Sequence, residues 1–336
     1  MKMRRLAWGA LAIGGVVAAS RAVRARHRFD VRGKSVLIAG GSRGLGLVLA
    51  RQLAERGARV ALLARDADEL ERAGIDLLAA GAGAVFVVPC DITDAGDVQR
   101  AIARVVDAFG SVDVLVNDAG LIQVAPLEAM SDGDFERSMA THFWGPFHLA
   151  RAVLPAMRAR RSGRIVNISS IGGLVPVPHL LPYVASKFAL TGFSLGLRAE
   201  LAKDEIVVTT ICPGLMRTGS PDHARFKGNR AAEFGWFGPA DSLPFLSMSA
   251  ERAARRIVRA LRYGEPLVVL GAPAKAAALL HALAPRLAAM VLQWVNRALP
   301  ADATGGRSQS GRESRSARLP AWLTTLSDRA AARNNE

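Results

Sequence analysis

The stretch KSVLIAGGSRGLGLVLARQLAERGARVALLAR, residues 34–65, decides the fold class of this sequence. Residues 34–40 and 58–65 are apolar runs that predict buried β-strands, and residues 45–56 between them have the spacing of a helix. A glycine-rich turn, residues 39–46, leads from the first strand into the helix. A strand, a crossover helix and a second strand in this order form a βαβ unit, in which the two strands are parallel.

The same alternation continues along the chain. Five more apolar runs predict strands at residues 84–90, 112–118, 163–169, 206–212 and 266–271. Helical stretches separate them, at residues 94–110, from about Ser131 to Arg160, and from Pro182 onward. We therefore predict an α/β fold for residues 31–271, with a Rossmann-like, doubly wound, parallel sheet of seven strands and helices on both faces.

An apolar segment, Leu6 to Ala19, precedes this domain and has basic residues on both sides. As a helix it would rise roughly 21 Å, less than the ~30 Å hydrocarbon core of a bilayer, although flanking arginines can snorkel to rescue a short span. We predict that residues 1–30 hold a membrane anchor and that the domain faces the cytoplasm. The alternatives are a signal peptide cleaved near Ala18, Ala19 and Ser20, and a helix that lies on the protein or in the membrane interface.

Two segments follow the domain. Residues 272–300 predict an apolar helical extension interrupted by Pro285, which would serve as a cap over a ligand site, a dimer face or a second membrane contact. Residues 301–336 are dominated by Gly, Ser, Arg and Asp, and we expect them to be disordered.

Charge and cysteine content narrow the function classes. The formal net charge is +15, and residues 1–34 hold nine Lys and Arg against the single acid Asp30, a pattern that suits anionic lipid. Only 6% of the residues are aromatic, whereas a nucleic-acid surface would interleave basic residues with stacking aromatics. Cys90 and Cys212 stand far apart and predict buried thiols in a reducing compartment. The histidines lack zinc-site spacing, so we predict neither a metal nor a nucleic-acid partner.

The glycine-rich turn AGGSRGLG, residues 39–46, predicts a phosphate-binding site. Gly40, Gly44 and Gly46 let the backbone approach a pyrophosphate, and the helix N-terminus that follows favours its negative charge. In the first βα turn of a Rossmann-like pattern, such a loop indicates a dinucleotide.

The end of the second predicted strand indicates which dinucleotide is bound. Folds that bind NAD generally place an acid there, which bonds the ribose 2′-hydroxyl, but this sequence has Ala64 followed by Arg65. Arg43 and the Ser42 hydroxyl lie in the turn itself, and two guanidinium groups near one ribose suit a 2′-phosphate. We predict NADP in preference to NAD. The alternative is that Arg65 pairs with Asp66 or Asp68 on the surface.

Tyr183 and Lys187, within PYVASK at residues 182–187, predict an acid–base pair. A phenol has a pKa near 10, and a neighbouring ammonium group stabilises the phenolate and lowers that pKa. At positions i and i+4 of one helix the two side chains share a face. Ser170 follows the strand at residues 163–169, at the sheet edge where such folds bind ligands, and Ser169 is its rival for this role.

These residues, in this order, resemble the classical short-chain dehydrogenase/reductase family from about Arg32 to Gly271. AGGSRGLG is similar to the family's TGxxxGxG with Ala39 in place of Thr, and VNDAG, residues 116–120, is similar to NNAG with Asp118 in place of the second Asn. CDITD, residues 90–94, resembles the family's acidic segment that contacts adenine. ISS…YVASK resembles the catalytic Ser-Tyr-Lys series, and CPGLMRT, residues 212–218, resembles the PGxxxT element.

The resemblance implies a role for each matching residue. Tyr183 would be the general acid/base, Lys187 would lower its pKa and bond the nicotinamide ribose, and Ser170 would orient the substrate carbonyl. Together with the turn and its arginines, the predicted cofactor site consists of Gly40, Ser42, Arg43, Gly44, Leu45, Gly46, Arg65, Asp91, Ile92, Asn117, Ala119, Gly120, Tyr183, Lys187, Pro213, Gly214 and Thr218.

His142 departs from the family pattern. In MATHFWGPF, residues 139–147, it stands where the family has an Asn that holds a water and relays protons to the lysine. A histidine can donate or accept a hydrogen bond, so we predict His142 as a fourth catalytic residue. The alternatives are an altered relay and a histidine with a structural role.

Taken together, the residues and the resemblance predict a membrane-associated, NADP(H)-dependent oxidoreductase that acts on a carbonyl or alcohol group. FGWFGPADSLPFLSM, residues 234–248, and the helical extension would cover an apolar substrate, or else serve as loop packing or an oligomer contact. Two other functions stay open: a non-catalytic NADP-binding interaction protein and an NAD-dependent alcohol dehydrogenase. Family habit also implies a homo-oligomer formed through the two long helices.

Overall fold

Seven parallel strands form the main sheet of the protein. The computed structural model describes residues 28–301, 306–315, 320 and 324–336, so the predicted anchor at Leu6 to Ala19 lies outside the described residues. The strands are β1 (Ser35–Ala39), β2 (Arg59–Ala64), β3 (Val85–Pro89), β4 (Val114–Asn117), β6 (Gly163–Ile168), β7 (Ile206–Pro213) and β11 (Leu267–Leu270). Their order is β11-β7-β6-β4-β1-β2-β3, and every pairing is parallel. The predicted Rossmann-like fold is confirmed.

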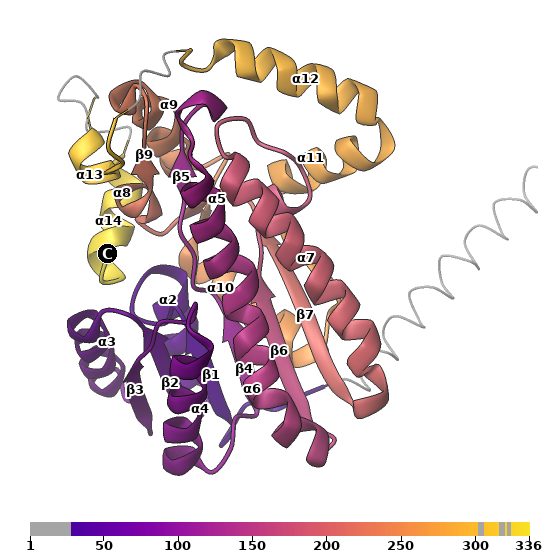
Figure 1. Ribbon diagram of the computed structural model, residues 1–336. Helices are drawn as coiled ribbons and strands as arrows, with labels where there is room; N and C mark the ends of the chain where they lie inside the picture. Colours follow the sequence, from indigo (N-terminus) through magenta and orange to yellow (C-terminus); the bar gives the residue numbers. More distant parts are fainter. Residues whose placement is uncertain (1–27, 302–305, 316–319, 321–323) are drawn as a thin grey trace, which may run out of the picture.

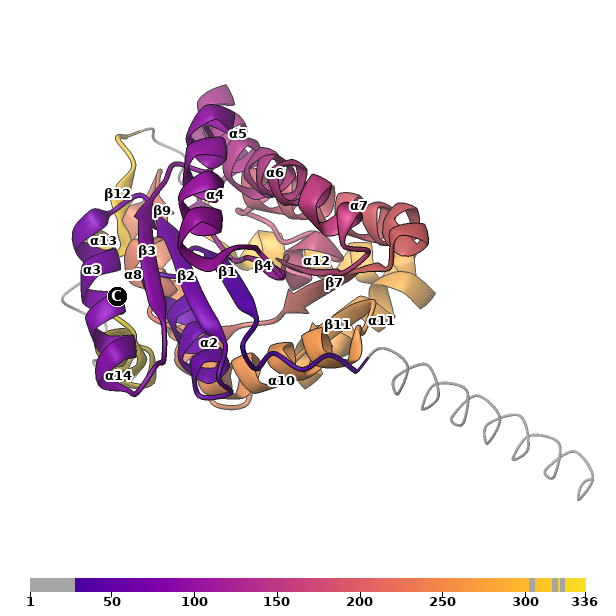
Figure 2. The same ribbon diagram turned by 90° about the horizontal axis from the view of Figure 1, so that it is seen from below.

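Alternate residues of each strand face two different helical layers, which Figure 2 shows on either side of the sheet. On one face, Val36 and Ile38 of β1 belong to a core with α2 (Gly44–Ala54), α3 (Ala67–Ala79) and α10 (Ala250–Tyr263). On the other, Leu37 and Ala39 belong to a core with α4 (Ala95–Phe109), α6 (Gly145–Ala159) and α7 (Leu181–Leu201). Because both faces are buried, the strands are continuous apolar runs.

The long helix predicted from about Ser131 to Arg160 is interrupted. Its first part is α5 (Asp132–Met139), its last part is α6, and a π-helical turn, η2 (Ala140–Trp144), joins them. Such turns frequently occur at functional sites. His142 lies within this turn and is fully buried.

Short elements cover the carboxyl edge of the sheet. A small sheet contains β5 (Gln123–Val124), β9 (Arg225–Phe226) and β12 (Gln309–Ser310), and a second one pairs β8 (Met216–Arg217) with β10 (Met248–Ser249). Two helices, α8 (Ser220–His223) and α9 (Arg230–Ser242), lie beside them. Phe234 and Phe237 of α9 are buried with Phe226 and Val124 in a third hydrophobic cluster. These two aromatic residues, which we expected to cover a substrate, are therefore core residues.

The helical extension predicted at residues 272–300 is confirmed. It consists of α11 (Ala272–Leu283) and α12 (Pro285–Ala298), with Pro285 at the first position of α12. Figure 1 shows the two helices as a hairpin at one end of the molecule. Among the described residues, no helix combines the length and the hydrophobicity that a membrane crossing requires.

The described part of residues 301–336 is ordered, contrary to our expectation of disorder. It contains β12, α13 (Gly311–Ser314) and α14 (Thr325–Arg333). Ala330 and Ala331 of α14 are buried, and the Arg51 guanidinium group of α2 donates to the Asn334 side chain and the Arg333 carbonyl. The segment is held by small side chains and polar contacts, which a composition argument based on large apolar residues overlooks.

Candidate active site

The glycine-rich turn lies against the end of β4. Gly40 has φ +83°, and a Cβ atom there would come within 2.6 Å of the Ala119 backbone nitrogen. A Cβ atom at Gly46 would overlap the Gly40 carbonyl oxygen. Strand order reverses between β1 and β4, and ligands of such sheets bind at this reversal. The two segments thus form a narrow backbone cradle that only glycine permits.

Both polar residues of the turn are bound to Glu69, in the first turn of α3. Arg43 Nη1 lies 2.7 Å from Glu69 Oε1, and the Ser42 hydroxyl donates to Glu69 Oε2 at 3.0 Å. Glu69 was not predicted as a site residue, because no motif marks it in the sequence. Arg65 is exposed at the end of β2 and makes no ion pair with Asp66 or Asp68 within the described ranges.

The residues expected near adenine follow β3. Asp91 Oδ1 accepts hydrogen bonds from the Thr93 backbone nitrogen at 2.9 Å and from its hydroxyl at 2.8 Å. Ile92 is buried against Gly145 at the start of α6. These contacts fix the shape of the loop after β3 and hold it against the start of α6.

Asn117, at the end of β4, offers a specific fit for a ligand. Its Nδ2 donates to Asn167 Oδ1 at 2.7 Å, while its own Oδ1 is buried without a partner among the described residues. A buried carbonyl oxygen without a partner is costly, so a bound donor would relieve it. This atom and the glycine cradle fit a dinucleotide.

The remaining predicted cofactor residues lie after β7. Pro213 ends β7, and the Gly214 backbone nitrogen donates to the Leu270 carbonyl at 2.9 Å, which ties this segment to β11. The Thr218 hydroxyl is buried and accepts from the Ser220 backbone nitrogen at 3.2 Å.

Tyr183, Lys187 and Ser170 come together at the start of α7. The Lys187 ammonium group lies 5.7 Å from the centre of the Tyr183 ring and donates to the Ile168 carbonyl at 2.9 Å. Ser170 follows β6, its hydroxyl accepts from the Gly172 backbone nitrogen at 3.0 Å, and it lowers the pKa of the Tyr183 phenol. Ser169 instead bonds the Lys187 carbonyl at 3.1 Å and Thr191 at 2.7 Å inside the core. The geometry therefore favours Ser170 over its rival.

Burial dominates the electrostatics of this pair. It raises the pKa of Tyr183 to about 12, against the opposing hydrogen bond from Ser170, and it lowers the pKa of Lys187 to about 8. Lys187 is not among the main influences on the pKa of the phenol, and its predicted effect on that pKa stays a prediction. At neutral pH the phenol is protonated and can donate a proton.

Asp118 places an ionisable carboxyl group beside Lys187. Burial raises the pKa of its carboxyl to about 8, and the ammonium group of Lys187 opposes that rise. In return the Asp118 carboxylate raises the pKa of Lys187. An acid next to the lysine, in place of an amide, ties the titration of the two groups together.

His142 has no free ring nitrogen. Nε2 accepts from the Leu121 backbone nitrogen at 3.1 Å, and Nδ1 lies 2.7 Å from the Ser186 hydroxyl, which itself donates to the Tyr183 carbonyl. These partners assign the proton to Nδ1. Burial, with Lys187 nearby, lowers the pKa of His142 well below 6.5. Since no ring nitrogen is left for a water, the structure favours a positioning role over the predicted relay.

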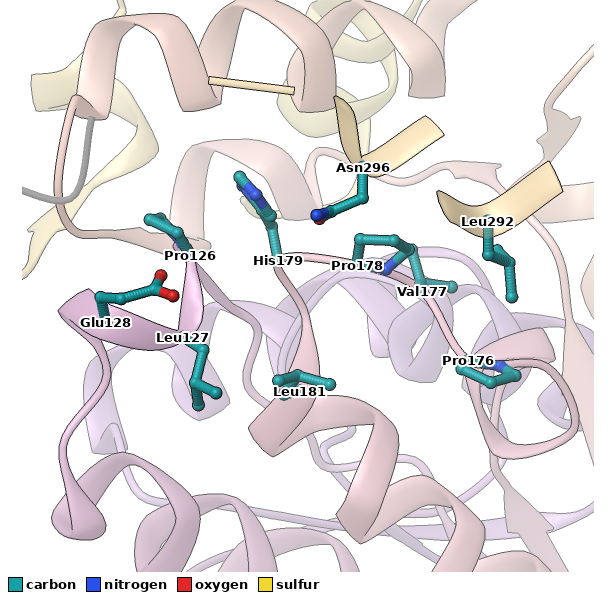
Figure 3. A pocket seen from close by; sticks show the side chains of 10 residues that line it. All are labelled: Pro126, Leu127, Glu128, Pro176, Val177, Pro178, His179, Leu181, Leu292 and Asn296. Atoms are coloured by element: carbon teal, nitrogen blue, oxygen red, sulfur yellow. The ribbon is translucent and has the colours of Figure 1, made fainter. Parts of the chain in front are cut away.

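A cavity of about 390 Å³ opens beside the first turn of α7 (Figure 3). Its lining is mostly apolar and includes Leu127, Val177, Leu181 and, from α12, Leu292. Tyr183, two residues after Leu181, is not part of the lining.

A buried polar network that the sequence analysis missed adjoins this cavity. His179, which lines the cavity with φ +62°, has its Nδ1 2.8 Å from Glu233 Oε1. Trp236 Nε1 donates to Glu233 Oε2 at 2.7 Å. The only signal in the sequence was a histidine four residues before Tyr183.

The last described residues lie on the glycine-rich turn. The Gly44 backbone nitrogen donates to the Asn334 carbonyl at 2.9 Å, and Asn335 Nδ2 donates to the Ser42 carbonyl at 2.8 Å. The Glu336 carboxyl group is 6% exposed and lies where a side chain at Gly44 would project. Figure 1 shows this end of the chain close to α3.

A parallel sheet with a phosphate-binding turn at its strand reversal, beside a Ser–Tyr–Lys group, is the arrangement of a nucleotide-dependent oxidoreductase. Comparison with known proteins agrees. Residues 34–226 match the sequence model of the short chain dehydrogenase family. The chain belongs to the short-chain dehydrogenase/reductase family, whose members are oxidoreductases.

Individual relatives and solved structures extend over most of the chain. Dehydrogenase/reductase SDR family protein 7-like of Anopheles gambiae is 37% identical over 266 residues, which cover 78% of this chain and 81% of that protein. A short-chain dehydrogenase from Streptomyces avermitilis is 32% identical, with a TM-score of 0.67, over 79% of this chain and 99% of that one. L-Sorbose reductase from Gluconobacter frateurii, solved with NADPH and L-sorbose, is 28% identical, with a TM-score of 0.65. The match covers 72% of this chain and 97% of the reductase chain.

Proposed function

We propose that the protein is an NADP(H)-dependent oxidoreductase that reduces the carbonyl group of an apolar substrate, with Tyr183 as the proton donor. The observation that carries the proposal is that Ser170, Tyr183 and Lys187 converge at the start of α7, where the Tyr183 ring and the Ser170 hydroxyl both lie beside Gly172 and Lys187 lies close to the ring. Ser170 orients the substrate oxygen, and Tyr183, protonated at neutral pH, donates a proton to that oxygen. Lys187 supports the phenolate that remains.

The turn after β1 would hold the dinucleotide. Its pyrophosphate would bind the glycine cradle, and Asn117 Oδ1 would accept a hydrogen bond from the ligand. When bound, the dinucleotide supplies or accepts the hydride. Arg43 and Arg65 support the choice of NADP, since no acid stands at the end of β2 to bond a free 2′-hydroxyl.

Replacement of Tyr183 tests the catalytic proposal. Tyr183→Phe removes the acid but keeps the ring, and we expect carbonyl-dependent NADPH oxidation to fall by roughly 10²–10⁴-fold with nucleotide affinity unchanged. Tyr263→Phe, at the end of α10, is the matched control with full activity. An active Tyr183→Phe enzyme would overturn the proposal. NADPH binding without turnover of any carbonyl would favour the non-catalytic alternative.

The arginines test the choice of dinucleotide. We expect Arg43→Ala combined with Arg65→Ala to weaken NADPH binding by roughly 10²–10⁴-fold, because two charge-assisted bonds to a phosphate contribute about 1.5–3 kcal/mol each. The dissociation constant for NADH, measured by nucleotide fluorescence, should stay the same. Tighter binding of NADH than of NADPH to the unaltered protein would favour the NAD-dependent alternative.

The cavity lining supports an apolar substrate class. The lining is mostly apolar, with Glu128, His179 and Asn296 as its polar members. A panel of ketones that runs from small polar to long-chain and polycyclic compounds is the direct test. Activity confined to the small polar compounds would exclude this substrate class.

We also propose that the protein is membrane-associated through residues 1–30, with the catalytic domain on the cytoplasmic side, and that copies pair through α6 and α7. Trp144, Phe188 and Leu195 are large apolar residues exposed on or next to these helices, which supports the pairing. Cell fractionation and mass measurement, with and without residues 1–30, separate the two proposals.

A further inference from the structure

The outward surface of α12 carries an apolar stripe. Leu287, Met290, Val291, Trp294 and Val295 are each between 43% and 68% exposed. Their spacing is i, i+3, i+4, i+7 and i+8, so they lie on one side of the helix. The opposite side faces the protein, where Ala288 is buried and Leu292 and Asn296 line the cavity.

Basic residues border this stripe. Arg286 and Arg297 lie along one edge of α12 with Gln293, and the Arg297 guanidinium group is 5.6 Å from the centre of the Trp294 ring. The sequence from Leu267 to Pro300 contains no acidic residue, while Lys275 precedes the hairpin turn. The surface therefore combines apolar side chains with uncompensated positive charge.

We propose that this face of α12 rests in the interface of an anionic bilayer. An apolar stripe edged by arginines is the pattern of a helix that lies in the membrane plane, with guanidinium groups at the headgroups. A second copy of the chain fits less well, because a twofold contact would bring the same basic edges together. The proposal does not depend on the catalytic one, since it concerns the outer side of α12 only.

The test uses the full chain with a spin label attached at Met290→Cys, because the native Cys90 and Cys212 are buried. In phosphatidylcholine vesicles containing phosphatidylglycerol, we expect the label to become accessible to oxygen and protected from a water-soluble nickel reagent. A label at Asp107→Cys, exposed on α4, should remain accessible to nickel. A Met290 label that stays in water on vesicle-bound protein overturns the proposal, as does a protein that binds no vesicles. Protection without vesicles, with a doubled mass, would show a second copy instead.

Charge removal provides a second measurement. Arg286→Gln combined with Arg297→Gln should weaken partition into phosphatidylglycerol vesicles roughly thirtyfold, at about 1 kcal/mol for each charge near the surface. Arg255→Gln combined with Arg256→Gln, on exposed positions of α10, is the matched control. Equal losses in the two double variants would contradict a specific role for α12.

A second, independent observation concerns the chain segment on the glycine-rich turn. Besides the bonds from Gly44 and Asn335, Arg72 Nε donates to Asn335 Oδ1 at 3.1 Å, and Arg51 donates to Asn334 at 2.9 Å. A Cβ atom at Gly219 would come within 2.6 Å of Ala331 Cβ, so α14 packs closely on the loop after β8. The segment thus takes a backbone N–H at the start of α2 that a pyrophosphate would need.

The groups that face Glu336 are mostly acidic. Glu69 lies on α3, Asp222 on α8, Asp241 on α9 and Asp118 after β4, while Arg43 and Arg312 provide opposing charge. His223 Nε2 is 3.3 Å from Glu336 Oε2. A carboxyl group held among other carboxyl groups is bound less firmly than a phosphate that Arg43 can pair with.

We infer that residues 324–336 compete with the dinucleotide for the turn, as an inhibitory segment that binding displaces. The inference rests on the proposed function, because it takes the turn to be the dinucleotide site. We expect Asn335→Ala combined with Glu336→Ala, which leaves α14 intact, to tighten NADPH binding roughly tenfold. Arg329→Ala, exposed on α14, should leave the affinity unchanged.

Hydrogen exchange separates this inference from the proposed function. Without nucleotide, amides of residues 42–46 should lose protection in the Asn335→Ala, Glu336→Ala variant. With NADPH, amides of residues 325–336 should lose protection in the unaltered chain. NADPH binding of equal strength in both proteins, with α14 still protected, overturns the inference and leaves the proposed function standing. Absence of NADPH binding in every variant overturns both.

Discussion

Two effects act in opposite directions on the pKa of Lys187. Burial favours the neutral amine and brings its pKa to about 8, whereas Asp118 favours the ammonium form. An amide in place of Asp118 could not provide that support. The titration of the lysine around pH 8 is therefore coupled to that of Asp118.

Asp118→Asn should reveal this dependence. Loss of the carboxylate lowers the pKa of Lys187 further, so the alkaline decline of kcat/KM should begin at lower pH than in the unaltered enzyme. The measurement is a pH–rate profile with saturating nucleotide, and Asp107→Asn, exposed on α4, is the control. A profile that does not move, or moves toward higher pH, contradicts the coupling.

At the scale of elements, the strands and the glycine-rich turn could be predicted because their signals are local. β1 to β4, β6, β7 and β11 are apolar runs, and the turn depends on residues adjacent in sequence. The π-helical turn at Ala140–Trp144 could not be predicted, because the residues around His142 keep an ordinary helical pattern. Two-residue strands such as β5, β9 and β12 are too short for any periodicity.

The residues of the candidate site that belong to a sequence motif could be predicted. The residues that are brought to the site only by tertiary contacts could not. Ser170, Tyr183 and Lys187 follow from order and spacing. Glu69, which holds Arg43, and the pair of His179 with Glu233 come from elements far apart in sequence. The predicted roles of His142 and of Lys187 toward the phenol stay predictions, because burial, which the sequence does not report, strongly affects the pKa of both His142 and Tyr183.

The turn between β1 and α2 should tolerate no side chain at Gly46. Gly46→Ala forces Cβ against the Gly40 carbonyl, so we expect the free energy of unfolding to fall by about 1–3 kcal/mol and nucleotide binding to be lost. The matched control is Gly192→Ala on α7, where a Cβ atom meets nothing within 4 Å. In that control the free energy of unfolding should stay unchanged or rise by about 0.5–1 kcal/mol, because alanine has a higher helix propensity than glycine. Urea unfolding and NADPH titration measure both, and equal behaviour of the two variants would contradict the cradle.

At the scale of the whole molecule, three buried carboxyl groups meet around the site. Burial raises the pKa of Asp118 and Asp241 to about 8 and that of Glu336 to about 7, and Glu336 further raises the other two. They come from the end of β4, from α9 and from the last described residues. Folding therefore brings together groups that hold protons at pH values where an unfolded chain has released them.

Stability should consequently decline as pH rises from about 4 to about 8. A carboxyl group with a raised pKa stabilises the fold fully below its unfolded value and loses that contribution through its folded value. We expect the midpoint of urea unfolding to be higher at about pH 5.5 than at about pH 8.5. The Asp118→Asn, Asp241→Asn, Glu336→Gln triple variant should show a flatter dependence. A midpoint that rises over this range contradicts the assignment.

The position of α14 on the turn also has a consequence for how the protein is made. Chains fold as they leave the ribosome, N-terminal part first, and residues 325–336 are translated long after the turn that they cover. A nascent chain therefore passes through an interval in which β1, α2 and β4 exist and nothing yet lies on Gly44. On the inference that residues 324–336 compete with the dinucleotide, a nascent chain should bind nucleotide more readily before that segment is made than afterwards.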